Sequence, residues 1–103
     1  MSTEQHPRYR LSDTLHQPVR FSIVAALAAT ESMDFGTLRD RLQVSDSVLS
    51  KQITIHEQAA IVQVQKGFVG KRPRTWLTLT SGGRLSWAAH LAALRDIAGA
   101  GEA

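Results

Sequence analysis

The polar residues best suited to binding chemistry gather on one side of residues 45–58. Drawn as a helix with about 100° per residue, this segment places five side chains within one arc of about 140°: Asp46, Ser47, Ser50, Lys51 and Thr54. Leu49 and Ile53 lie on the opposite side. Short hydroxyl side chains let a helix approach the base edges of a duplex, and a lysine reaches a phosphate or a guanine. The pattern indicates a helix that docks in the major groove of DNA, with Ser45 as its N-cap and Gln52 at the edge of the contact face.

A polar outer face is also the ordinary form of any surface helix. This helix is not basic, because Asp46 and Glu57 outnumber Lys51. The face taken alone therefore leaves a plain solvent-exposed helix open as an interpretation.

A second group of candidate residues is basic. Residues 58–95 contain six Lys or Arg and no Asp or Glu, whereas residues 1–57 contain six basic and seven acidic residues. Four of the cations flank a glycine-containing loop: Lys66, Lys71, Arg72 and Arg74. Long cations on such a loop can contact phosphates or enter a minor groove. Charge at a hairpin edge also prevents edge-to-edge strand pairing, but one or two lysines would meet that need, and four modestly exceed it.

The elements that must hold the first group are helices. Pro18 suits the first turn of a helix that continues to about residue 29. Asp34 is an N-cap for a second helix, in which Phe35, Leu38 and Leu42 recur at helical spacing. The third helix begins at Ser45, so the connection is only the two to three residues of 42–44. So short a connection forces a tight helix-turn-helix corner.

The elements that hold the second group are strands. Residues 62–65 alternate apolar and polar side chains, and Thr75, Leu77 and Leu79 do so again. Gly67, Gly70 and Pro73 mark the loop between the two strands, so the cations lie at a hairpin tip.

Thr80 is placed to cap a last helix that runs to about residue 98. The predicted order is helix, helix, helix, strand, strand, helix. This is a mainly α fold with a small β-hairpin (α+β), the layout of a winged helix-turn-helix domain. We expect the domain over residues 11–98, a flexible N-terminal arm over residues 1–10 and a disordered tail over residues 99–103.

The last helix carries two apolar stripes. One contains Leu85, Ala88, Ala89 and Ala92, and the other contains Trp87, Leu91 and Leu94. A domain of 103 residues has little else to cover the second stripe, so we expect a homodimer. Its predicted interface combines that stripe with a short N-terminal helical turn: Leu11, Leu15, Trp87, Leu91 and Leu94. The alternative is that both stripes fold into a single core.

Enzymatic chemistry has no recognisable centre in the sequence. There is no cysteine, and the four histidines show no metal-ligand spacing, so we expect no thiol chemistry, metal site or cofactor. Gly82 and Gly83 lack the context of a phosphate-binding fingerprint. Without a signal-peptide pattern or a run of about 20 apolar residues, we expect a cytoplasmic protein that does not cross a membrane.

Three stretches of the sequence resemble MarR/ArsR-type winged helix transcriptional regulators. Residues 15–20, with Ile23 and Leu27, are similar to the opening helix of that family. Residues 44–51 are similar to the entry of its recognition helix, and residues 66–76 with 79–84 to its wing and the start of its last helix. The resemblance covers residues 11–95. It implies a homodimer that presents two recognition helices to successive major grooves, in a family whose members respond to metals, phenolic ligands or redox change.

The sequence departs from that family at three positions. Val48 stands where Asn is frequent, His56 where a buried Leu is usual, and Ala60 where a helix-ending Gly is usual. These changes leave open the end of the recognition helix, the role of His56, and the DNA sequence preference. The resemblance implies double-stranded DNA as partner and leaves room for a small-molecule effector. A winged helix adaptor that binds protein and not DNA is the alternative.

Overall fold

The structure, a computed structural model, describes residues 5–100. Four helices precede the hairpin: α1 (Asp13–His16), α2 (Pro18–Ala28), α3 (Phe35–Leu42) and α4 (Asp46–Gln58). The strands are β1 (Met33–Asp34), β2 (Val62–Val69) and β3 (Arg72–Leu79). A short 3₁₀ turn, η1 (Pro7–Arg10), begins the described chain, and α5 (Ser81–Ala100) ends it. The predicted fold class and element order are confirmed, with β1 as an additional strand.

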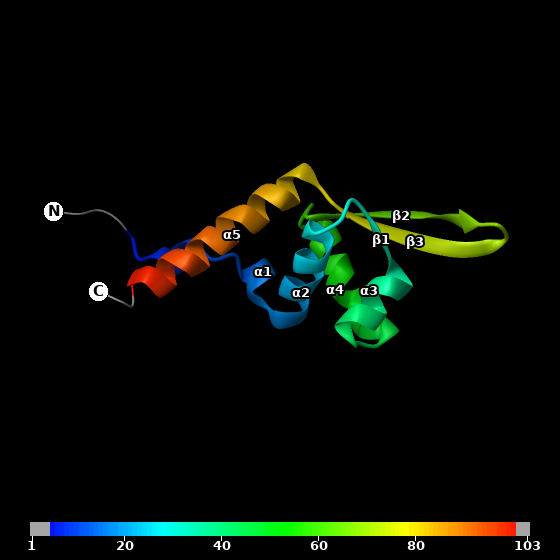
Figure 1. Cartoon of the computed structure of the whole chain (residues 1–103), viewed down its shortest axis with the longest axis horizontal. Coiled ribbons are helices and arrows are strands. Elements are labelled where there is room, and N and C mark those ends of the chain that lie inside the picture. The colour runs from blue at the N-terminus through cyan, green and yellow to red at the C-terminus, as the bar shows by residue number, and fades with distance from the viewer. Residues whose placement is uncertain (1–4, 101–103) are drawn as a thin grey trace.

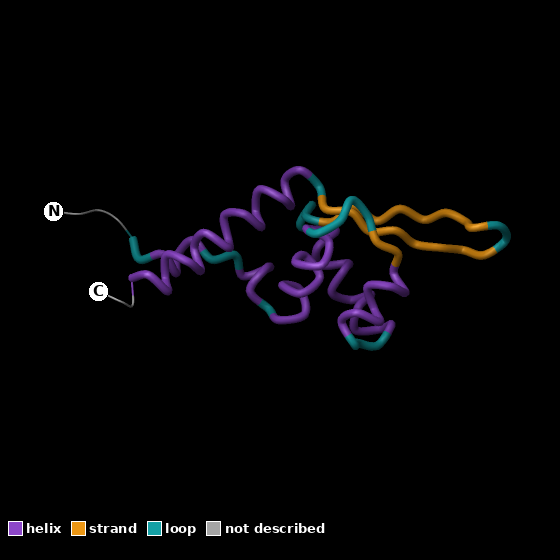
Figure 2. The backbone as a smooth tube through the Cα atoms, viewed as in Figure 1, coloured by secondary structure: helices purple, strands orange, loops and turns teal. Residues whose placement is uncertain are grey.

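The molecule is elongated, with extents of 64 × 25 × 21 Å. The helices α2, α3 and α4 form the body, the β2–β3 hairpin extends from one side of it, and α5 extends from the other (Figure 1). The backbone trace shows the hairpin and the far half of α5 at opposite ends of the molecule (Figure 2). None of the helices within residues 5–100 combines the length and the hydropathy that a bilayer span requires.

Side-chain caps fix where the helices of the body begin. The Asp34 carboxylate accepts a hydrogen bond from the Thr37 N–H at 3.2 Å, and α3 begins at the next residue, Phe35. The Ser45 hydroxyl accepts from the Val48 N–H at 3.2 Å in the same way. Each cap satisfies a backbone donor that the first helical turn leaves free. The predicted caps Asp34 and Ser45 are therefore confirmed.

The sheet is antiparallel in the order β1-β3-β2. The hairpin is longer than the sequence predicted, because the pairing runs out to Phe68 with Pro73 and Val69 with Arg72. The loop is therefore only Gly70 and Lys71, with Gly70 at a φ of 62°. Pro73 fits within β3 because β1 pairs only with Trp76 and Leu77, which leaves that edge of β3 unpaired at Pro73.

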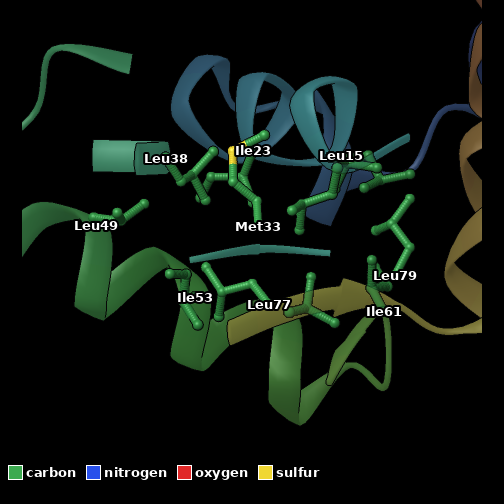
Figure 3. Packing of buried hydrophobic residues seen from close by; sticks show 12 residues of the cluster. Leu15, Ile23, Met33, Leu38, Leu49, Ile53, Ile61, Leu77 and Leu79 are labelled. Atoms are coloured by element: carbon green, nitrogen blue, oxygen red, sulfur yellow. The ribbon is translucent and has the colours of Figure 1, made fainter. Parts of the chain in front are cut away.

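One apolar core joins the helices of the body to the base of the sheet. It includes Ile23, Leu38, Leu49 and Leu77, all fully buried (Figure 3). Leu15 of α1 is also fully buried in this core. The prediction that Leu15 lies in a dimer interface was therefore wrong, because its side chain has no surface left for a second subunit.

The chain ends differ from their predicted form. Pro7–Arg10 is not a loose arm but forms η1, which packs on α5, and the Arg10 guanidinium pairs with the Asp96 carboxylate at 2.6 Å. The helix α5 continues to Ala100, two residues past the predicted end. The remainder of the predicted arm and tail, residues 1–4 and 101–103, lies outside the described residues.

Two residues close the turn from α4 into β2. Ala60 has a φ of 59°, the left-handed conformation that favours glycine. The departure from the usual Gly thus leaves the left-handed turn in place, with an alanine under strain. The Thr80 hydroxyl donates to the Ala60 carbonyl at 2.7 Å and accepts from the Gly83 N–H at 2.8 Å, which confirms Thr80 as the cap of α5.

Candidate nucleic-acid interface

The polar face of α4 is exposed, and its apolar face is buried. Ser47, Ser50, Lys51 and Thr54 are all exposed, whereas Leu49 and Ile53 belong to the core. The division that the helical period predicted is thus present in the folded chain. Val48, which the sequence did not single out as a contact, is also 41% exposed. An exposed methyl-bearing side chain is the group that packs on a thymine methyl in a major groove.

The first turn of α4 is tied to α3. The Arg39 guanidinium pairs with the Asp46 carboxylate at 2.9 Å and with Asp40 at 3.1 Å. Arg39 therefore offsets the negative charge of Asp46 at the N-terminal end of α4. The sequence placed Asp46 in the interface but did not find Arg39, because residues seven apart on two different helices show no pattern.

Gln52 and Thr54 have partners within the chain. The Gln52 side-chain oxygen accepts from the Arg20 guanidinium at 2.9 Å, while Arg20 Nε donates to the Thr14 carbonyl at 2.7 Å. One side chain thus connects α1, α2 and α4. The Thr54 hydroxyl donates to the Ser50 carbonyl at 3.0 Å, so it offers lone pairs to a ligand rather than its proton.

The strand register sorts the wing cations onto two faces. Successive side chains of a strand point to opposite faces. Lys66 therefore shares a face with Val64 and Phe68, whereas Arg72 and Arg74 lie on the other face with Trp76. Lys71 lies in the turn. Cations are consequently available on both sides of the wing.

The helix and the wing meet at a shared groove of about 350 Å³. From α4 it is lined by Ser50, Thr54 and Glu57, and from the hairpin by Lys66 and Thr75 among others. Three hydroxyl groups and an ammonium group thus face one groove, beside one carboxylate. Of the residues that the sequence singled out, Ser50, Thr54 and Lys66 line this groove, whereas Lys71, Arg72 and Arg74 do not. The Ser50 and Thr75 hydroxyls and the Lys66 ammonium are groups that suit a sugar-phosphate strand.

Comparison with known proteins decides the family. Residues 19–98 match the model of the winged helix DNA-binding domain. The chain belongs to this family. Membership identifies it as a DNA-binding regulator, and the predicted MarR-type resemblance is confirmed.

Solved structures share this winged helix fold. A transcriptional regulator homologue from Pyrococcus horikoshii OT3 is 25% identical, with a TM-score of 0.81 over 86% of this chain and 88% of that one. NadR in complex with 4-hydroxyphenylacetate is 23% identical, with a TM-score of 0.71 over 93% and 67%. The M. tuberculosis transcriptional regulator MOSR in complex with DNA is 19% identical, with a TM-score of 0.68 over 90% of this chain and 63% of that one. No curated protein sequence matches the chain.

Of the two apolar stripes of α5, the one expected to be exposed for dimerisation is the more buried. Trp87 packs its ring on Phe21 of α2, with centroids 4.8 Å apart, so much of it is covered by its own chain. Leu91, Leu94 and Leu11 are partly buried. The alanine stripe is the more open one: Leu85 is 73% exposed, and Ala88 and Ala89 are exposed.

Two buried histidines brace the winged helix domain. The side-chain Nε2 of His56 lies 3.0 Å from the Arg20 carbonyl, to which it donates, and His90 Nδ1 accepts from the Ser12 N–H at 3.1 Å. The remaining ring nitrogens, His56 Nδ1 and His90 Nε2, are buried without a hydrogen-bond partner. In residues 5–100 no three His, Asp or Glu side chains could hold a metal. His56 therefore holds α4 against α2, and His90 holds α5 against the N-terminal cap of α1.

Acidification is expected to destabilise the domain through these two histidines. Burial lowers the pKa of His56 and of His90, so between their folded values and about 6.5 the unfolded chain binds more protons. Stability is then constant above about pH 7 and falls as the pH drops through 6.5, by at most about 1.4 kcal/mol per pH unit for each histidine. Urea unfolding at pH 7.5, 6.5 and 5.5 measures this.

A substitution assigns the pH effect to its source. His90→Gln should flatten the dependence of the unfolding free energy on pH, because it removes one of the two buried imidazoles. An equal slope in the wild type and in His90→Gln would contradict the role of His90.

Proposed function

We propose that the protein is a sequence-specific transcriptional regulator that binds double-stranded DNA as a homodimer. The helix α4 lies in the major groove, and the wing holds the adjacent backbone. The single observation that carries this proposal is the groove that α4 and the wing share, with hydroxyls from both and Lys66 at its wall.

Each contact has a distinct role in this arrangement. Ser47, Ser50, Lys51 and Thr54 face bases and nearby phosphates, with Gln52 at the edge and Asp46 held back by Arg39. Ser45 caps the helix end, whose free N–H groups attract a phosphate. Lys71, Arg72 and Arg74 hold the flanking backbone without regard to sequence.

The homodimer is proposed from the part of α5 that extends beyond the body of the domain. Beyond His90 the helix is covered by η1, and Leu11, Leu91 and Leu94 remain partly exposed there. A second subunit packed on this part of α5, with its contact extending as far as Trp87, would bury these three leucines. It would place two recognition helices about 34–36 Å apart, one turn of DNA. In this role we expect the protein to act in the cytoplasm.

A small-molecule effector is part of the proposal on the evidence of similar folds. NadR was solved in complex with 4-hydroxyphenylacetate, and the PcaV regulator from Streptomyces coelicolor with its natural ligand. An adaptor that binds protein through α4 remains the second candidate, since Asp46, Val48 and Glu57 make that helix weakly acidic and partly apolar.

Selection of bound fragments from a genomic library at two salt concentrations tests DNA binding and recovers the site. In gel shifts, Lys51→Ala and Ser47→Ala should each lower the preference for the recovered site over scrambled DNA by about 5- to 150-fold, since a good base contact is worth about 1–3 kcal/mol.

Ser86→Ala is the matched control, because Ser86 is exposed on α5 and lies outside the shared groove. It should leave that preference unchanged. Recovery of no fragment would favour the adaptor, and equal losses on specific and scrambled DNA would contradict base contacts by Ser47 and Lys51.

A further inference from the structure

The far end of the wing carries an apolar group that the fold does not use. Phe68 is 71% exposed and Val69 is 48% exposed, and both lie in the last two residue pairs before the turn. Neither belongs to the buried core. A small exposed apolar residue is normal on a protein surface, but a 71% exposed phenylalanine at a projecting tip is a large apolar group open to contact.

The register fixes which way Phe68 points. It lies two residues beyond Lys66 on the same face of β2, and Lys66 lines the groove shared with α4. Phe68 therefore continues that side of the wing past the end of the groove, with Pro73 opposite it on β3. Val69 points to the other face, beside Arg72.

The charge around the tip of the wing indicates which partner Phe68 contacts. Lys66 lies two residues before it on the same face and Lys71 lies in the adjoining turn, and no Asp or Glu occurs between residues 58 and 95. A positive potential of this kind draws a polyanion to the tip. Edge-to-edge pairing with another strand is disfavoured there, because Pro73 lacks a donor and cations line the edge.

We propose that Phe68 is an apolar wedge that enters the minor groove beside the recognition helix and partly unstacks one base step. Proteins that bind the minor groove insert such side chains between bases while neighbouring cations hold the phosphates, and the duplex bends away from the wedge. The proposal rests on the proposed DNA binding. It adds a source of sequence preference, because the cost of unstacking depends on the step.

The test uses the full chain and a duplex recovered by the genomic selection. Hydroxyl-radical footprinting locates the wing, and 2-aminopurine is placed at successive positions under it. The wild type should raise the fluorescence at one step severalfold and shorten the end-to-end distance measured by energy transfer. Phe68→Ala should abolish both signals and weaken binding by about 5- to 150-fold, the range for loss of a base–aromatic contact.

Two further variants separate the wedge from other effects. Phe68→Trp should restore the fluorescence signal, and Val69→Ala, a change on the opposite face of the same hairpin, should keep it. The salt dependence of binding should be the same in Phe68→Ala and the wild type, because no cation is lost. Unaltered fluorescence and affinity in Phe68→Ala would overturn the wedge while DNA binding stands. Failure of the wild type to bind any duplex would overturn both.

Discussion

Replacing Arg72 and Arg74 together with alanine is expected to weaken binding to every duplex by about 60-fold at 0.1 M salt. Each phosphate contact contributes about 0.9 to the slope of log K against log salt, so two lost contacts flatten that slope by about 1.8. Both residues are exposed on the outer face of the wing, and neither forms a salt bridge within the described chain, although Arg74 lies near Asp34 and helps to lower the pKa of that carboxyl. The measurement is a binding titration at four or more salt concentrations, on the recovered site and on scrambled DNA.

Arg8→Ala combined with Arg95→Ala is the matched control. It removes the same charge from exposed positions on η1 and α5, far from the wing (Figure 1). Both positions lie on the part of α5 and η1 proposed for dimerisation, so sedimentation must first show that this control has the same oligomeric state as the wild type. Its salt slope should then stay within error of the wild-type value. If both double variants flatten the slope equally, net charge and not the wing governs binding, and the proposed role of Arg72 and Arg74 fails.

Gly83→Ala is expected to destabilise the domain by about 3 kcal/mol or more, a large fraction of the 5–15 kcal/mol that holds a typical domain together. A Cβ atom at Gly83 would lie 2.3 Å from the Ile61 carbonyl oxygen and 3.0 Å from its carbon. These are backbone atoms at the start of the hairpin, and the Thr80 N–H donates to the same carbonyl at 3.0 Å. Neither side can move without opening the junction of α5 with the sheet. Urea unfolding followed by circular dichroism measures the loss.

Neighbouring positions supply controls of opposite sign. A Cβ atom at Gly82 would lie 3.8 Å from the Thr80 hydroxyl, an ordinary contact, so Gly82→Ala should be neutral or stabilise the helix by up to about 1 kcal/mol. Ala60→Gly relieves a left-handed alanine and should stabilise by about 1 kcal/mol. Equal stabilities for Gly82→Ala and Gly83→Ala would contradict the close approach.

The recognition helix could be predicted because its signals are local. Ser45 caps it, and Leu49 and Ile53 face inward at helical spacing, all within one segment. The two-residue strand β1 could not be found, because Met33 and Asp34 carry no alternation and pair with Leu77 and Trp76, more than 40 residues away. Its pairing depends on the tertiary fold alone.

Other features were not predicted for the same reason, because they depend on contacts between distant segments. Gly67 and Pro73 predicted a loop, but Gly67 lies within β2, where an added Cβ atom would meet Trp76 at 3.3 Å. Both stripes of α5 are apolar in sequence. Which of them packs on the body depends on the position and direction in which the chain leaves β3, and the sequence of α5 does not contain that information. Arg20 was unpredictable because its partners, Thr14 and Gln52, lie on two different elements.

The hairpin and the far half of α5 lie at opposite ends of a 64 Å molecule. In the proposed dimer, damage to one end would leave the other able to work. A subunit with a defective wing would still pair through α5 with a normal subunit. The mixed dimer would then have one functional wing in place of two and would bind DNA more weakly. Alleles that disable the wing would then be dominant over the normal copy, whereas alleles that disable pairing would be recessive.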